Sequence, residues 1–372
     1  MRIGMIGLKG VPFPAGIENF TEQVGARLVE RGHEVTVYVR PYVDVADVYR
    51  GMRIRRLPSI NTKHLDALSH TIVATLDVLF ADLDVVHYHA LGPSVFSLLP
   101  RLRGLKTVAH VHGLDWQRAK WNAFAGGCLR AAEYSAVYFP HRTVAISTTL
   151  KRYLEAKYGR PVDYVPTGVE TYTYTEPREI TQWGLGRENY ILFLSRLVPE
   201  KGCHHLIEAY ERLSTSMPLV IAGGSTHTDA YAASLRRTSN PNVLFTGEVR
   251  GRVLAELFSN AYVYVLPSDV EGLAHSLLQA LSYGRFVLAS DIEPNLEALG
   301  GCGRTFRQGD PVDLARQLQL LIDRPDLVAE GAERGRARVS QEYSWDAVVD
   351  SLEAVYERCL ATPVARPAVS GR

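Results

Sequence analysis

Short apolar runs alternate with segments of helical spacing along the first half of the chain. Arg2–Ile6 is a predicted buried strand, and residues 18–31 have the spacing of an amphipathic helix that Gly32 would end. Further strands are predicted at residues 35–39, 84–87, 107–112 and 144–146. Strand–helix alternation of this kind predicts a parallel sheet with helices on both faces.

The alternation stops between about residues 167 and 188, where Thr, Tyr, Pro and Gly dominate, and then resumes. We interpret this segment as a connection between two domains, at residues 1–168 and 169–343. In the second domain, strands are predicted at 190–194, 219–222, 243–245, 263–266 and 286–289, and helices at 203–213, 252–258 and 273–283. The pattern predicts an α/β protein whose two doubly wound domains face each other across a cleft.

The last part of the chain has an amphipathic helical pattern over about residues 344–360, and residues 361–372 are expected to be a disordered tail. The full length of 372 residues suits two domains. A formal net charge of +1 gives no overall attraction to nucleic acid, so we expect no nucleic-acid partner.

The cysteines and the first residues bear on the cellular compartment. The four cysteines form no C-x-x-C pair and no zinc or disulfide pattern, which favours reduced thiols. The first apolar run meets glycine too early for a secretory signal, and no run of about 18 apolar residues occurs. We therefore expect a cytoplasmic protein.

A glycine-rich loop follows the first strand. Gly7, Gly10 and Gly16 lie between a predicted strand and a predicted helix, where backbone N–H groups can hold a phosphate. Their spacing is not that of the dinucleotide fingerprint, and the second strand ends at Arg40 rather than at an acidic residue. A phosphate-facing loop and a simple tight turn both remain open.

Two cations stand at the start of the second domain. Arg196 follows an apolar strand directly, and Lys201 comes five residues later, before a predicted helix. Cations at the carboxyl end of a parallel strand suit a diphosphate, which arginine can bind in a bidentate way. The alternative is two surface cations with Glu200 as their partner.

An acidic residue opens another predicted helix. Glu271 precedes the segment 273–283, and the N–H groups of Gly272 and Leu273 would be free for an anion. Gln279 lies eight positions later, about 80° around a helix from Glu271, so both could face one cavity. The alternative is a carboxylate that only stabilises the helix start.

Two histidine pairs, His87 with His89 and His110 with His112, occupy strand positions that share a face. Four imidazoles could form a metal site, but no Asp or Glu stands beside either pair. We interpret the pairs as hydrogen-bonded structural residues and expect no metal.

Taken together, these motifs resemble glycosyltransferase family 4, whose members are retaining enzymes of the GT-B fold with two Rossmann-like domains. The resemblance runs from Met1 to about Tyr356. Its order and spacing are specific, although each motif alone is weak. It is carried by Gly7-Leu8-Lys9-Gly10 with Gly16-Ile17-Glu18, His110-Val111-His112-Gly113, Ser195-Arg196, Glu200-Lys201-Gly202, Glu271-Gly272 and Ser344-Trp345.

The resemblance implies roles for particular residues. Arg196 and Lys201 would neutralise the donor diphosphate, His112 would contact the donor sugar near the reacting carbon, and Glu271 would hold a sugar hydroxyl. The C-terminal helix would cross back onto the first domain. The implied donor-binding set is Gly10, Gly16, Arg196, Lys201, Val249, Gly272, Leu273 and Gln279, and the segment 247–249 would lie against the base.

The implied reaction transfers a sugar from a nucleotide-diphosphate sugar to an acceptor hydroxyl with retention, and needs neither a metal nor another cofactor. Gln279 departs from the family, which has a second glutamate there; an amide binds a ribose diol more weakly than a carboxylate does. A nucleotide-sugar epimerase, a metal-dependent hydrolase using the histidines and a silent nucleotide-sugar binder are the alternatives.

The acceptor is expected in polysaccharide, glycolipid or other glycoconjugate biosynthesis. The basic stretch 101–106 and the segment 116–121, with two tryptophans, could contact an anionic bilayer that carries a lipid-linked acceptor. This would place the protein peripherally on the inner face of the cell membrane. An ordinary solvated cationic surface is the alternative.

Overall fold

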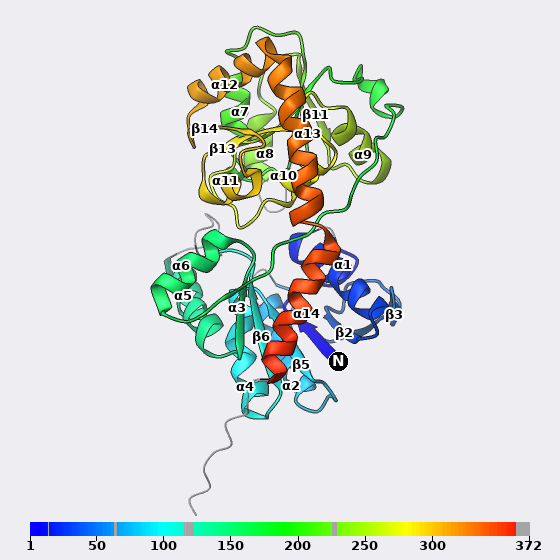
Figure 1. Cartoon of the computed structure of the whole chain (residues 1–372), viewed down its shortest axis with the longest axis vertical. Helices are drawn as coiled ribbons and strands as arrows, with labels where there is room; N and C mark the ends of the chain where they lie inside the picture. The colour runs from blue at the N-terminus through cyan, green and yellow to red at the C-terminus, as the bar shows by residue number, and fades with distance from the viewer. Residues whose placement is uncertain (14, 63–64, 115, 117–122, 225–228, 362–372) are drawn as a thin grey trace, which may run out of the picture. The chain divides into compact units, whose positions relative to one another are not determined.

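The computed structural model describes residues 1–13, 15–62, 65–114, 116, 123–224 and 229–361, and it divides into two compact domains (Figure 1). The first domain comprises residues 1–167 and the chain from Trp345 onward, and the second comprises Gly168–Ser344. The predicted disordered tail lies outside the described residues, apart from Ala361, which is helical.

The described strands of the first domain form one sheet in the order β3-β4-β2-β1-β5-β6-β7-β8. Its pairings are parallel, apart from the antiparallel β3–β4 hairpin. The strand order reverses direction between β1 and β5, which is where ligands of doubly wound sheets bind. The strands are β1 (Arg2–Ile6), β2 (Glu34–Val39), β3 (Val48–Tyr49), β4 (Met52–Arg56), β5 (Val85–His89), β6 (Lys106–Val111), β7 (Arg142–Ala145) and β8 (Asp163–Tyr164).

Alternate residues of these strands enter two apolar cores. Val85 and Val108 belong to the core that includes residues of α1 and α14, whereas Val86 and Tyr88 belong to the core beneath α2. The red helix α14 therefore packs on the sheet of the first domain (Figure 1). The described helices are α1 (Gly16–Glu30), α2 (Asp66–Val78), α3 (Leu91–Ser94), η1 (Val95–Ser97), α4 (Leu98–Leu102), α5 (Ala123–Tyr138), α6 (Thr148–Tyr158) and α14 (Trp345–Ala361).

The second domain contains an entirely parallel sheet in the order β11-β10-β9-β12-β13-β14. Here the strand order reverses between β9 and β12. The predicted α/β fold with two doubly wound parallel sheets is thus confirmed. The strands are β9 (Ile191–Leu194), β10 (Leu219–Ala222), β11 (Val243–Gly247), β12 (Val263–Leu266), β13 (Phe286–Ser290) and β14 (Arg304–Phe306).

Helices cover the second sheet. They are η3 (Ile180–Trp183), η4 (Pro199–Lys201), α7 (Cys203–Tyr210), α8 (Asp229–Leu235), α9 (Gly251–Asn260), α10 (His275–Ser282), α11 (Glu293–Leu299), α12 (Pro311–Asp323) and α13 (Pro325–Glu342).

The segment interpreted as a connection is part of the second domain. The buried carboxylate of Glu256 accepts hydrogen bonds from the backbone N–H groups of Arg178, Glu179 and Ile180 at 2.8–3.2 Å. Hydrogen bonds to a carboxylate are roughly twice as strong as neutral ones, so they hold this irregular segment against α9. The chain leaves the first domain at Thr167, and the residues that follow are packed rather than a free linker.

Candidate active site

The carboxyl ends of β9 and β12 approach each other closely at the switch point of the second sheet. Gly202 has φ +65°, and a Cβ there would lie 1.9 Å from the carbonyl oxygen of Pro267, just after β12. A Cβ on Gly223, after β10, would lie 1.9 Å from the carbonyl oxygen of Ser195. Both positions therefore require glycine, and the loops after three strands are held together at one edge.

Arg196 and Lys201 both lie at this edge but in different surroundings. Arg196 is exposed, and no side chain in the described part of the chain bonds to its guanidinium. Lys201 is half-buried, and its Nζ donates to Oε1 of Glu271 at 2.5 Å. The predicted cations are thus at the carboxyl end of the sheet, and the acidic partner of Lys201 is Glu271 rather than Glu200.

The prediction that Glu271, Gly272 and Leu273 open a helix is wrong. Helix α10 begins at His275, and these three residues lie in the bend between β12 and α10. The bend is fixed by the bond to Lys201 and by the N–H of Asp269, which donates to the carbonyl of Glu200 at 2.9 Å. The helix-dipole argument therefore does not apply to Gly272 and Leu273, and their donor contacts stay a prediction.

Gln279 does lie on α10, but the 80° angle to Glu271 has no meaning because Glu271 is not helical. The Gln279 Nε2 donates to the Tyr172 hydroxyl at 3.3 Å, and the Tyr172 ring stacks on Tyr283 at 4.2 Å. Burial raises the pKa of Tyr172, so the phenol stays protonated and can itself donate. Glu271 and Gln279 thus have separate partners.

Val249, expected against the base, follows β11 and is half-buried. Gly247 has φ +75°, and its carbonyl accepts from the Gly223 N–H at 2.8 Å, which ties this loop to the end of β10. The structure places Val249 at the carboxyl edge of the second sheet, and its contact with a base stays a prediction.

In the first domain, the glycine loop also lies at a switch point. Gly7 has φ +106°, and a Cβ there would lie 2.4 Å from the His89 carbonyl oxygen at the end of β5. The buried Glu18 accepts from the Lys9 N–H at 3.0 Å, so this amide already has an anionic partner. Gly10 packs against Val43, and Gly16 begins α1 with open space around it. A phosphate contact of this loop stays a prediction.

His112 follows β6 and is half-buried. Its Nε2 lies 3.1 Å from Nδ1 of His89, within hydrogen-bond distance, and its ring lies 4.1 Å from that of His110. The edge of Phe20 from α1 contacts His112 at 5.4 Å between centroids. His89 therefore orients the ring of His112, and the contact of this ring with the donor sugar stays a prediction.

Two of the three cations in the basic stretch 101–106 are engaged within the domain, whereas Arg103 is exposed. The Arg101 guanidinium donates to the carbonyls of Tyr138, Phe139 and Pro140 at 2.9–3.2 Å, capping the end of α5. Lys106 is buried within β6. Of the segment 116–121, only Trp116 is described, and it bonds to Glu133; the rest lies outside the described residues.

Family models and relatives match most of this chain, including the larger part of each domain. A model described as Glycosyltransferase Family 4 matches residues 14–172, and one described as glycosyl transferases group 1 matches residues 176–338. A GDP-mannose-dependent alpha-(1-6)-phosphatidylinositol monomannoside mannosyltransferase of Mycobacterium tuberculosis is 28% identical over 92% of this chain and 94% of its own. A phosphatidyl-myo-inositol mannosyltransferase of Mycolicibacterium smegmatis is 26% identical, over 96% and 94%.

Solved structures show the same fold. Anabaena HepE in complex with UDP and glucose superposes with a TM-score of 0.80 at 18% identity, covering 96% of this chain and 100% of that chain. A sucrose-phosphate synthase from Thermosynechococcus elongatus gives 0.80 at 18% identity, over 97% and 99%. The fold and the phosphate-suited edge define a glycosyltransferase of the GT-B class that uses a nucleotide sugar. The chain belongs to glycosyltransferase family 4.

Three contacts at these edges were not predicted from the sequence. Tyr172 bonds Gln279 across 107 positions, His89 bonds His112 across 23, and Gly223 approaches Ser195. The Gly223-Gly224 pair after a strand could have indicated a close backbone approach. The other two pairings depend on the three-dimensional fold.

Proposed function

We propose that the enzyme transfers its sugar with retention of configuration and without a divalent ion on the donor diphosphate. The observation that carries this proposal is the exposed guanidinium of Arg196, without a bonded side chain in the described residues, beside the Lys201–Glu271 pair. Two cations at one edge can stabilise charge developing on a leaving diphosphate, which is the task that a metal performs in other enzymes.

In the proposed reaction the bond between the anomeric carbon and the diphosphate oxygen breaks, and the acceptor oxygen attacks from the same face. The leaving diphosphate oxygen takes the acceptor proton, so no side chain has to act as a base. Glu271 is held by Lys201 at 2.5 Å, which suits a carboxylate that accepts a sugar hydroxyl and orients the lysine.

GDP-mannose is the first donor to test, because the mannosyltransferase of Mycobacterium tuberculosis is named for it, and UDP-glucose is the second. The names of two relatives also specify phosphatidylinositol-type acceptors. We propose a lipid-linked acceptor of this kind for the present chain.

Helix α2 supports a membrane-proximal acceptor. Its buried side includes polar residues such as His70, Thr71 and Thr75, and its exposed side is apolar. Among the described residues, no helix has the length and hydrophobicity to cross a bilayer. Peripheral contact through the exposed side would bury apolar area. That side presents Leu65, Leu68, Ile72 and Leu76 at helical spacing, followed by Phe80, which is 87% exposed.

The stereochemistry and the metal requirement are tested together. Purified enzyme, GDP-mannose and a phosphatidylinositol acceptor are incubated with and without EDTA, and the linkage is assigned by the NMR coupling at the anomeric carbon. The proposal requires an α-linked product and equal rates in both samples. A β-linked product, or a rate that EDTA abolishes and Mg²⁺ or Mn²⁺ restores, would refute it.

The membrane contact is tested separately by flotation with anionic liposomes. Replacing Leu68, Ile72 and Leu76 with serine should abolish flotation and leave transfer to a detergent-dispersed acceptor intact. The matched control is Val312→Ser, which removes an exposed apolar side chain from α12 in the second domain. Equal flotation of both variants would refute the role of α2.

A further inference from the structure

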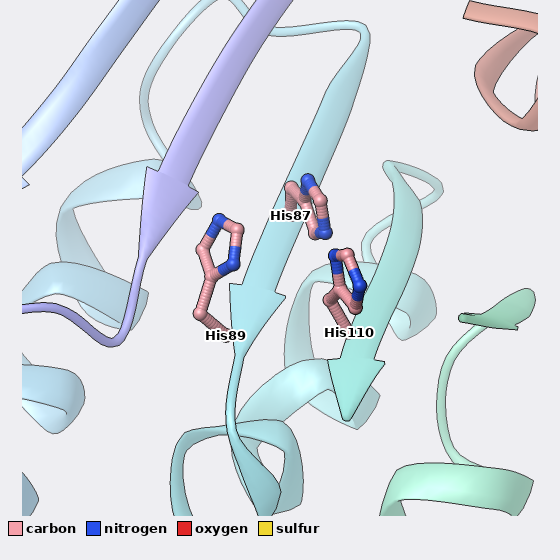
Figure 2. A group of neighbouring side chains, drawn as sticks. All are labelled: His87, His89 and His110. Carbon is pink, nitrogen blue, oxygen red and sulfur yellow. The ribbon is translucent and has the colours of Figure 1, made fainter. Parts of the chain in front are cut away.

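Three histidines replace the apolar core at the carboxyl end of two neighbouring strands in the first domain. His87 and His89 continue the row that Val85 begins on β5, and His110 continues the row of Val108 on β6; His89 and His110 are paired in the sheet. All three side chains are fully buried. Figure 2 shows their rings gathered on one side of β5 and β6.

Each of the three rings uses one nitrogen in a hydrogen bond and leaves the other without a partner. No described group bonds to Nε2 of His87, Nε2 of His89 or Nδ1 of His110. Three unpartnered ring nitrogens in one place are unusual, because buried polar atoms are nearly always bonded. The bonded nitrogens pair as His87 Nδ1 with the Tyr356 hydroxyl at 2.7 Å, His89 Nδ1 with His112 Nε2 at 3.1 Å, and His110 Nε2 with the Val165 carbonyl at 3.2 Å.

The tautomer of His110 follows from its partner. A backbone carbonyl only accepts, so His110 Nε2 must carry the hydrogen that it donates to Val165. In a neutral ring the other nitrogen, Nδ1, then carries no hydrogen, and its lone pair accepts no hydrogen bond from the described residues. An imidazole held by a carbonyl in this way is the usual arrangement of a histidine that ligates a metal.

We propose that His87, His89 and His110 bind one divalent transition-metal ion, with zinc as the best match, inside the first domain. Each residue offers one ring nitrogen, and these three atoms lie within 4.8 Å of one another. Nitrogens bound to one zinc are separated by roughly 3–4 Å, so the rings would have to move by about 1 Å. They would also have to turn, because the ring of His87 lies at 5° to that of His110 and at 32° to that of His89. Three histidines with one further ligand are an established way to hold zinc.

This ion is distinct from any ion on the donor diphosphate. Its ligands are enclosed in the core beneath α1 and α14, so it would stabilise the end of the first sheet. Through the 3.1 Å contact of His89 with His112 it would also fix the orientation of the His112 ring. This metal site is independent of the stereochemistry and the donor proposed for the reaction.

The test is the metal content of the full-length protein, expressed in zinc-supplemented medium and purified without chelator, measured by inductively coupled plasma mass spectrometry. We expect about one zinc per chain. In the triple variant His87→Asn, His89→Asn and His110→Gln, each amide places a polar atom near the ring nitrogen that is hydrogen-bonded in the wild type and has no counterpart of the other nitrogen. This variant should contain at least about tenfold less zinc. His70→Asn is the matched control, since His70 is another buried histidine of this domain with an unpartnered Nε2. It should keep its zinc.

A second measurement decides the case where the triple variant does not fold. Wild-type protein is unfolded with a chelator, dialysed and refolded with Co²⁺, whose tetrahedral sites absorb in the visible range. The proposal requires this absorption, and a melting temperature higher than that of protein refolded without metal. Wild-type protein free of zinc and colourless with Co²⁺ would overturn it and assign the three nitrogens to ordered water, as would unchanged zinc content in the triple variant.

Discussion

The two sheets place opposite kinds of side chain at their switch points. The first sheet ends in buried, neutral imidazoles of His87, His89 and His110, whereas the second ends in an exposed guanidinium, Arg196, and an ion pair, Lys201 with Glu271. Both edges use a glycine so that neighbouring loops can touch. Without a bound metal, one architecture thus supports a desolvated, uncharged edge and a charged one, and the charged edge is the one whose cations suit a diphosphate.

Removing the guanidinium should have the largest effect. For Arg196→Ala we expect turnover to fall by at least about 100-fold, because a positioned donor to developing charge is lost. Steady-state kinetics with saturating donor measure this. Arg196→Lys should recover part of the rate, since it restores charge without the bidentate geometry. The control is Arg316→Ala, an exposed arginine of α12; if the two alanine variants were equally active, the phosphate role would be wrong.

The ion pair should show in stability as well as activity. Lys201→Met or Glu271→Gln leaves one charge largely buried without its partner, so each should lower the free energy of unfolding by about 1–3 kcal/mol. The double variant should lose less than the sum of the two. Urea unfolding of the four proteins measures this coupling. Additive losses would show that the 2.5 Å contact contributes no net stabilisation.

Lowering the pH should destabilise the first domain more than the second. In the protein without bound metal, the folded pKa of His87, His89 and His110 lies below that of the unfolded chain, so below pH about 6.5 the unfolded state binds more protons and stability falls as pH falls. Each such group contributes up to about 1.4 kcal/mol per pH unit. For His89 this loss continues to pH about 3.

The second domain contains one comparably shifted histidine, His275, whose pKa burial lowers to about 4, within the residues that the structure describes. Hydrogen exchange of the whole protein between pH 7 and pH 5 resolves the two domains. Protection should be lost first around β5 and β6, after correction for the intrinsic exchange rate. Equal loss of protection in β9 and β12 would contradict the expected difference in acid stability between the two domains.

The smallest effect is expected at Gln279. Gln279→Glu introduces a carboxylate that can accept ribose hydroxyls, and the Tyr172 hydroxyl can donate to it in place of the present 3.3 Å bond. We expect the KM for donor to fall by roughly threefold to tenfold, the value of one charge-assisted bond. Gln317→Glu on α12 is the control. A raised KM would show that the amide is the better ribose ligand here.

Much of the fold was predictable because apolar runs mark buried parallel strands. Leu219–Ala222 and Val263–Leu266 were predicted with their observed bounds, and Arg196 and Lys201 follow from their place beside such strands. The start of α10 was not predictable, because the apolar residues before His275 continue its spacing. Their bend is imposed by the Lys201–Glu271 pair, which joins residues 70 positions apart.

Turn geometry accounts for another element that the sequence did not indicate. Strands β3 and β4 are joined at Arg50 and Gly51, both with positive φ, of 47° and 77°. Such two-residue turns are usually recognised by Asn-Gly or Asp-Gly, and arginine gives no such signal. Likewise, the histidine pairs could be recognised in the sequence, but their hydrogen-bond partners could not. Tyr356 and Val165, which bond one nitrogen of His87 and of His110, lie elsewhere in the sequence.

The return of the chain to the first domain at Trp345 has a consequence for biosynthesis. On the ribosome, the first 167 residues emerge without α14, whose buried side belongs to their core. Until the second domain has been translated, helix α14 and its Tyr356, the partner of His87, have not yet been made. The face of the sheet that α14 covers is then exposed, and this apolar surface would attract chaperones. The second domain is continuous from Gly168 to Ser344 and can fold first, even though it is made later.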